Sequence, residues 1–138
     1  MSNSDENRWR QRLANFEKIM ARFDAACDIA DYTDLERAGL IKTFEFSFEL
    51  AWKTLKDLLF YEGYEESTPR GVWRRAFEAS YIDEATAETA LDALDKRNLL
   101  THTYNEETAE EATDLITEQY APMLREILEA LQARRDAR

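Results

Sequence analysis

The sequence predicts an all-α protein, an up-and-down four-helix bundle with one additional short helix. Among its 138 residues only three are Gly and two are Pro, so few positions favour turns, whereas the good helix formers Ala, Leu, Glu and Arg are abundant. Apolar residues recur at three- and four-residue steps through long segments, which is the spacing of an amphipathic helix. Residues that favour helix ends separate those segments.

The first predicted helix spans about 8–30. Its apolar residues form one periodic set: Trp9, Leu13, Phe16, Ile19, Met20, Phe23 and Cys27. We interpret Trp9 as a core residue and Cys27 as a small apolar residue on the same face. Because the residues before this helix are polar, we expect 1–7 to be a disordered tail and 8–138 to be a single domain.

The second predicted helix begins after Thr33, which forms a capping-box pattern with Glu36, and ends near Gly63, a residue suited to the turn after a helix. One apolar stripe of this helix is expected to face the core: Leu40, Phe44, Phe48, Ala51, Trp52, Leu55 and Leu59. A second apolar set lies off that stripe and consists of Phe46, Leu50 and Phe60. A helix that is apolar on two sides is usually buried on two sides, so this pattern favours an oligomer.

Between these two apolar sets runs a narrow polar line of Glu45, Glu49 and Lys53, each four residues from the next. We interpret it as a solvated row of paired charges, in preference to a carboxylate site.

The remaining helices are predicted from their caps. Thr68 followed by Pro69 starts a short helix that runs to about 80. Asp83 is the expected cap of the next helix, which presents Ala87, Leu91, Leu94 and Asn98 along one side. Asn105 is the expected cap of the last helix, which runs to about 133. Pro122 should kink or divide that helix near 118, because Pro cannot donate a hydrogen bond to the preceding turn.

The segment 97–104 contains the chain's only histidine, His102, together with Arg97, Asn98 and Tyr104. A histidine can both take and give a proton near neutral pH, and an arginine can hold a phosphate with two parallel donors, so the pair suits phosphodiester cleavage. On an unbroken helix Arg97 and His102 would point roughly 140° apart. We therefore expect a helix to end inside the motif. From spacing alone, a histidine near an arginine at a helix end is more often a surface or cap residue beside the last helix carbonyls than a catalyst.

The pattern Arg97-Asn98-x3-His102-x-Tyr104 resembles the Arg-x4-His-x-Tyr motif of HEPN domains, small helical bundles that include many metal-independent ribonucleases. The segments 44–57, 68–70 and 105–109 extend the likeness. Together with the motif they are similar to the nucleotidyltransferase substrate-binding proteins, the HEPN partners of HEPN/MNT toxin–antitoxin pairs. The resemblance covers about 8–131.

The resemblance implies a toxin that cleaves RNA through the 2′-hydroxyl without a metal. In that role His102 would transfer protons, and Arg97 would stabilise the charge that builds on phosphorus. Asn98 would position His102 or the phosphate. It also implies a partner antitoxin, a minimal nucleotidyltransferase, that neutralises the toxin by attaching AMP to Tyr104. The alternative is a non-catalytic substrate-binding subunit of a two-component nucleotidyltransferase. Neither interpretation assigns a cofactor or a metal to this chain.

The formal net charge of −11 is unusual for a protein that contacts RNA. An RNA-binding site would therefore need a local basic patch, for which we select Arg70, Arg74 and Lys96 beside Arg97. The acidity also favours a partner protein with a basic surface.

Because one chain supplies a single histidine and cleavage needs both an acid and a base, we expect a symmetric homodimer with a shared site. The polar N-terminus and the lack of an apolar run of about 20 residues predict a cytoplasmic protein without membrane contact.

Overall fold

The fold is that of a computed structural model, which describes residues 3–101 and 105–137. Its elements are α1 (Asn3–Cys27), α2 (Asp34–Tyr61), α3 (Pro69–Glu78), α4 (Glu84–Thr101), α5 (Glu106–Leu115), the π-helical segment η1 (Ile116–Tyr120) and α6 (Ala121–Asp136). The described part of the chain contains no strand, which confirms the all-α class. Also within that part, no helix combines the length and apolarity needed to cross a membrane.

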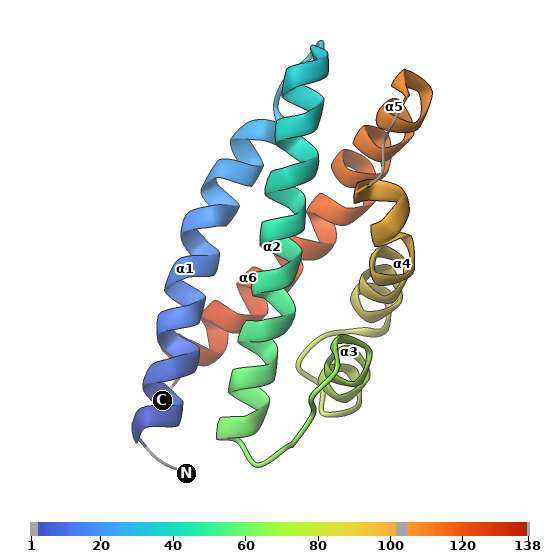
Figure 1. Ribbon diagram of the computed structural model, residues 1–138. Helices are drawn as coiled ribbons and strands as arrows, with labels where there is room; N and C mark the ends of the chain where they lie inside the picture. Colours follow the sequence, from blue (N-terminus) through green and yellow to red (C-terminus); the bar gives the residue numbers. More distant parts are fainter. Residues whose placement is uncertain (1–2, 102–104, 138) are drawn as a thin grey trace.

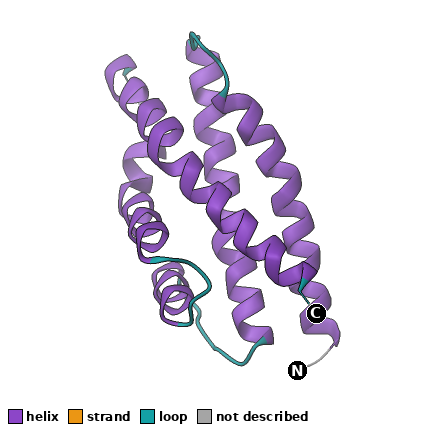
Figure 2. Ribbon diagram, turned by 180° about the vertical axis from the view of Figure 1, so that it is seen from behind, coloured by secondary structure: helices purple, strands orange, loops and turns teal. Residues whose placement is uncertain are grey.

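Helices α1 and α2 lie side by side and run in opposite directions (Figure 1). In Figure 1 α6 passes behind α1 and α2, and Figure 2, which shows the molecule from behind, has α5, η1 and α6 following one another as a single long rod in front of them. Helix α4 packs on the other side of α2, and the short α3 contacts both α2 and α4. The arrangement is a helical bundle with one additional short helix.

The start of α1 differs from the prediction. The helix begins at Asn3, so the expected disordered tail over 1–7 is wrong from Asn3 onward. Acidic residues in the first turn favour the positive end of the helix dipole. One of them, Glu6, pairs with Arg10 at 3.2 Å and accepts a hydrogen bond from the Tyr61 hydroxyl at 3.4 Å. Glu6, which lies before the apolar stripe of the helix, thus forms one contact within α1 and one with the end of α2.

The helix ends predicted from capping residues are confirmed. In four places a side-chain oxygen accepts the backbone N–H three residues later, over 2.8 to 3.1 Å: Thr33 from Glu36, Thr68 from Gly71, Asp83 from Thr86 and Asn105 from Thr108. At the end of α2, Gly63 has a φ of 101°, and Tyr64 N–H donates to the Leu59 carbonyl at 2.8 Å. This is the Schellman arrangement, which glycine adopts without strain.

The core contains the predicted α2 stripe, except that Trp52 is only half-buried. Two phenylalanines of that stripe join the layers of the bundle. Phe44 stacks on Tyr120 of η1 with ring centroids 5.4 Å apart, and Phe48 stacks on Trp73 of α3 at 5.6 Å. These contacts fix η1 and α3 against the middle of α2. Trp9 is buried, as predicted.

The buried face of α4 differs from the predicted one. Ala87, on the predicted side, is buried, but Leu91 and Leu94 are half-buried and Asn98 is exposed, whereas Ala90 and Ala93 have no exposed surface. Small side chains allow helix backbones to approach closely, so the alanines face the bundle and the leucines pack at its rim. The prediction was wrong for the leucines because it expected the large apolar side chains of α4 to face the bundle, where the small alanines lie instead.

The division of the last helix near 118 is confirmed. The π-helical segment η1 ends one residue before Ala121, whose N–H donates to the Ile116 carbonyl five residues back. Pro122 follows in the first turn of α6, where its missing N–H leaves no bond unmade.

Candidate functional site

The candidate site lies where α4 ends and α5 begins. Arg97 and Asn98 are exposed in the last turns of α4, and the helix ends at Thr101, so the motif spans a helix C-terminus as expected. The other two motif residues, His102 and Tyr104, fall in 102–104 and lie outside the described residues.

The end of α4 packs over the middle of α2 and leaves a hollow of about 180 Å³. Arg97 and Leu100 line it from α4, and Phe44, Glu45, Phe48 and Glu49 line it from α2. Within the described part of the chain, no carboxylate oxygen lies within 4.0 Å of the Arg97 guanidinium.

The two carboxylates of this hollow have other cationic partners. Glu49 pairs with Lys53 at 3.2 Å and accepts the indole N–H of Trp52 at 3.1 Å, whereas Glu45 pairs with Lys42 at 3.4 Å. The polar line of α2 is therefore a row of paired charges. Arg97 lies beside this row, and within the described part of the chain its guanidinium has no carboxylate partner. It is therefore suited to bind a phosphate or another anion.

A second hollow, of about 230 Å³, lies on the other side of the junction. It lies between the first turns of α2, with Asp34 and Arg37, and the start of α5, with Asn105 and Glu106. Arg37 approaches the carboxylates of Asp34 and Glu110, both at 3.6 Å, which is long for an ion pair with direct hydrogen bonding. The junction thus extends along α2 from Asp34 to Glu49, with one arginine in each hollow.

Arg37 was missed by sequence reasoning. It precedes the motif by 60 positions, and no local pattern relates an arginine in the first turns of one helix to the end of another. Only the packing of α5 beside α2 places Arg37 near the α4–α5 junction.

The residues selected as a basic patch are spread over α3 and α4. Arg70 forms an ion pair with Asp95, and Lys96 pairs with Asp92 at 3.3 Å. Arg74 is exposed and faces a separate hollow between α3 and α4. The aspartates of α4 therefore balance two of the three selected cations.

Tyr120 contacts the middle of α4 from the core. Its buried hydroxyl donates to Asp92 Oδ2 at 2.7 Å, which ties α4 to η1. Burial, and then the hydrogen bond to Asp92, raise the pKa of Tyr120 well above its ordinary value of 10.0. The phenol therefore stays protonated, as a donor must be, across the physiological pH range.

No cluster of three or more metal-ligating side chains is present among residues 3–101 and 105–137. The chemistry that this arrangement supports is the binding of an anion at Arg97, whereas Arg37 already lies near the carboxylates of Asp34 and Glu110.

Comparisons with known proteins agree with the fold. The family described as "nucleotidyltransferase substrate binding protein like" matches residues 11–133. A crystal structure of a protein from Thermus thermophilus is similar, with a TM-score of 0.78 and 34% sequence identity over 85% of this chain and 98% of that one. The curated proteins give no match. Since the matched region begins in α1, ends in α6 and includes the α4–α5 junction, the chain belongs to the nucleotidyltransferase substrate binding protein-like family.

Proposed function

We propose that this protein is the substrate-binding subunit of a two-component nucleotidyltransferase whose catalytic subunit is a separate chain. The observation that carries the proposal is the family match over 11–133, which spans α1 to α6. The net charge of −11 supports it, because an acidic surface favours association with a basic protein over binding along a nucleic acid.

The α4–α5 junction is the part of this subunit that we assign to the transfer reaction. We propose Tyr104 as the acceptor of AMP. In that step the phenolic oxygen attacks the α-phosphorus of ATP, a new P–O bond forms, pyrophosphate leaves, and the phenolic proton passes to a base of the catalytic subunit. Arg97, in the hollow between the end of α4 and the middle of α2, is suited to hold the attached phosphate.

The exposed face of α2 supports a symmetric homodimer as the form of this subunit. Leu35 and Phe46 are 83% and 52% exposed, and their spacing of 11 residues places both on one side of the helix. Large apolar side chains repeated along one helix face are typical of a surface that another chain covers.

A HEPN-type endoribonuclease is the second candidate function. The observation that favours it is Arg97, exposed and without a carboxylate partner in the described part of the chain, directly beside Asn98. In this proposal Arg97 stabilises the phosphorane, Asn98 positions the phosphate or His102, and His102 transfers protons. Arg70, Arg74 and Lys96 would then contact the RNA backbone, and AMP on Tyr104 would block the site.

One pair of experiments separates the two functions. The chain is co-expressed with a candidate nucleotidyltransferase from the same organism, and its intact mass is compared between wild type, Tyr104→Phe and the control Tyr64→Phe, which removes the hydroxyl of an exposed tyrosine elsewhere in the chain. A gain of AMP units that is lost only in Tyr104→Phe supports the assigned acceptor. No stable complex and no gain in wild type would refute the subunit function.

The second experiment incubates the isolated chain with structured RNA in EDTA. Fragments that disappear in His102→Ala would establish the ribonuclease. Intact RNA together with partner binding leaves the substrate-binding subunit as the function.

A further inference from the structure

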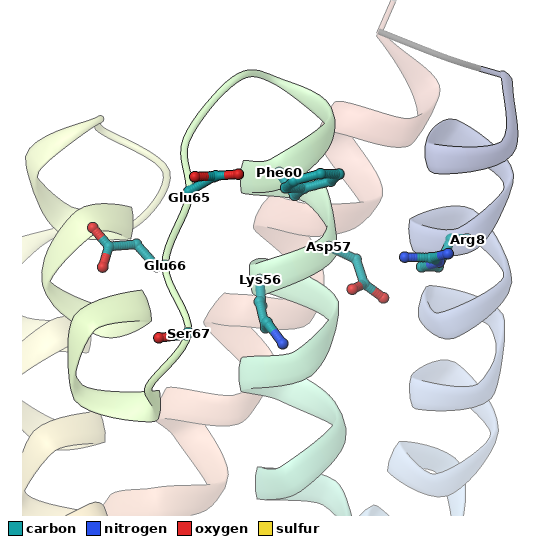
Figure 3. A pocket seen from close by; sticks show the side chains of 7 residues that line it. All are labelled: Arg8, Lys56, Asp57, Phe60, Glu65, Glu66 and Ser67. Carbon is teal, nitrogen blue, oxygen red and sulfur yellow. The ribbon is translucent and has the colours of Figure 1, made fainter.

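A hollow of about 500 Å³ lies away from the α4–α5 junction, over the last turns of α2. Figure 3 shows Arg8 reaching into it from α1, Lys56, Asp57 and Phe60 from α2, and the segment 65–67 forming the opposite wall. A volume of this size is within the range of roughly 300–1,000 Å³ that small-molecule sites occupy.

Two cations of the hollow, Arg8 and Lys56, form no ion pair within the described part of the chain. Asp57 pairs with Arg12 at 2.9 Å, and Glu66 pairs with Arg75 at 3.1 Å, so arginines outside the hollow hold two of its three carboxylates. For Arg8 and Lys56, the described part of the chain offers no carboxylate oxygen within 4.0 Å. In a chain with a net charge of −11, this is a local site for an anion.

The charges around Asp57 show how closely the cations gather. Burial raises the pKa of this carboxyl, and the charges of Arg12, Arg8 and Lys56 act against that rise. The charges of Arg8 and Lys56 therefore both act on the Asp57 carboxyl.

The other walls differ in chemistry from this cationic side. The ring of Phe60 is 47% exposed and offers a flat apolar face. Across the hollow, Glu65 supplies a carboxylate and Ser67 a hydroxyl, the groups that commonly bind sugar hydroxyls (Figure 3). A ligand that uses all three walls carries a phosphate, an aromatic ring and a polar linker with hydroxyls.

We infer that this hollow binds a nucleoside phosphate. The phosphate pairs with Arg8 and Lys56, the base stacks on Phe60, and the ribose hydroxyls donate to Glu65 or bind Ser67. The inference goes beyond the proposed function, since it needs neither the catalytic subunit nor the α4–α5 junction.

The test is calorimetric titration of the isolated chain with AMP, and separately with its two halves, adenosine and inorganic phosphate. AMP should bind at least about tenfold more tightly than either half, because only AMP contacts both the cations and the ring. Lys56→Gln and Arg8→Gln should each weaken AMP binding about tenfold and leave adenosine binding unchanged. Phe60→Ser should weaken both AMP and adenosine.

Two matched controls lie on the same helix outside the hollow. Lys42→Gln removes an exposed lysine and Phe46→Ser removes an exposed phenyl ring, and neither should change AMP affinity. Inorganic phosphate binding as tightly as AMP would reduce the site to a simple anion site and overturn the inference. So would an equal loss of affinity in Lys42→Gln and Lys56→Gln.

A second measurement does not depend on the folding of any variant. Backbone amide chemical shifts of the wild-type protein should move on AMP addition around 56–67 and near Arg8. Shifts centred elsewhere, or none at millimolar AMP, would refute the site. Because no partner is present, this result is independent of the outcome for the proposed function.

Discussion

The hydrogen bond between Tyr120 and Asp92 provides the sharpest test of how α4 is held. Tyr120→Phe keeps the buried ring that stacks on Phe44 and removes only the hydroxyl, which donates to Asp92 at 2.7 Å. A hydrogen bond to a charged group contributes about 1.5–3 kcal/mol. Asp92 is 40% exposed and also pairs with Lys96 at 3.3 Å, so water and the lysine still solvate it after the change. We therefore expect a loss at the lower end, about 1.5 kcal/mol.

For a chain of this length that loss corresponds to a fall in Tm of about 5 °C, measured by calorimetry or circular dichroism. Tyr61→Phe is the matched control, because its half-buried hydroxyl makes a long bond of 3.4 Å to Glu6. A bond of that length is weak, so its loss should lower Tm by less than about 1 °C. Equal shifts in the two variants, or no shift in Tyr120→Phe, would refute the assignment of Tyr120 as the residue that holds α4.

Three further predictions concern a thiol, the junction and the assembly. Burial raises the pKa of Cys27 from 9.0 to about 11, so near pH 8 a disulfide reagent should modify it about a hundredfold more slowly than an unhindered thiol. Because the folded chain holds the thiol proton of Cys27 more tightly than the unfolded chain, the free energy of unfolding should fall as the pH rises from 9.0 towards 11. If Cys27 reacted as fast as a thiol in a short peptide, both the slow modification and this pH dependence would be contradicted. Arg97→Lys should leave Tm unchanged but abolish RNA cleavage if the ribonuclease proposal holds, since lysine lacks the forked donor; full cleavage would mean that Arg97 is only a helix cap. Light scattering at micromolar concentration should give the mass of a dimer for the wild type, and Phe46→Ser should weaken the association of the two chains. A monomeric wild type would exclude the shared site.

The features that the sequence predicted well depend on residues close to one another in the chain. A capping bond joins a side chain to an N–H three residues later, so Thr33 and Asn105 could be identified without knowing the fold. The end of α2 at Gly63 and the division of the last helix before Pro122 are local in the same sense. Each follows from the backbone preferences of one or two residues.

The features that were missed depend on contacts between distant segments. Residues 3–7 belong to α1, and one of them, Glu6, contacts Tyr61, which lies 55 residues away in the sequence. The pairing of Arg70 with Asp95 spans 25 positions and is set by how α3 packs on α4. No periodicity in the sequence could have indicated it.

The distribution of charge explains how an acidic chain can present sites for anions. At physiological salt the Debye length is about 8 Å, so an exposed anion senses mainly the charges nearest to it, whatever the total of −11. Near Arg97 the carboxylate of Glu49 is paired with Lys53, and near Lys56 that of Asp57 is paired with Arg12. In both places another cation, Lys53 or Arg12, pairs with the nearest carboxylate, so that Arg97 or Lys56 has no ion-pair partner in the described part of the chain. A sequence-wide count of charge hides this arrangement, because it depends on which of several cations each carboxylate contacts.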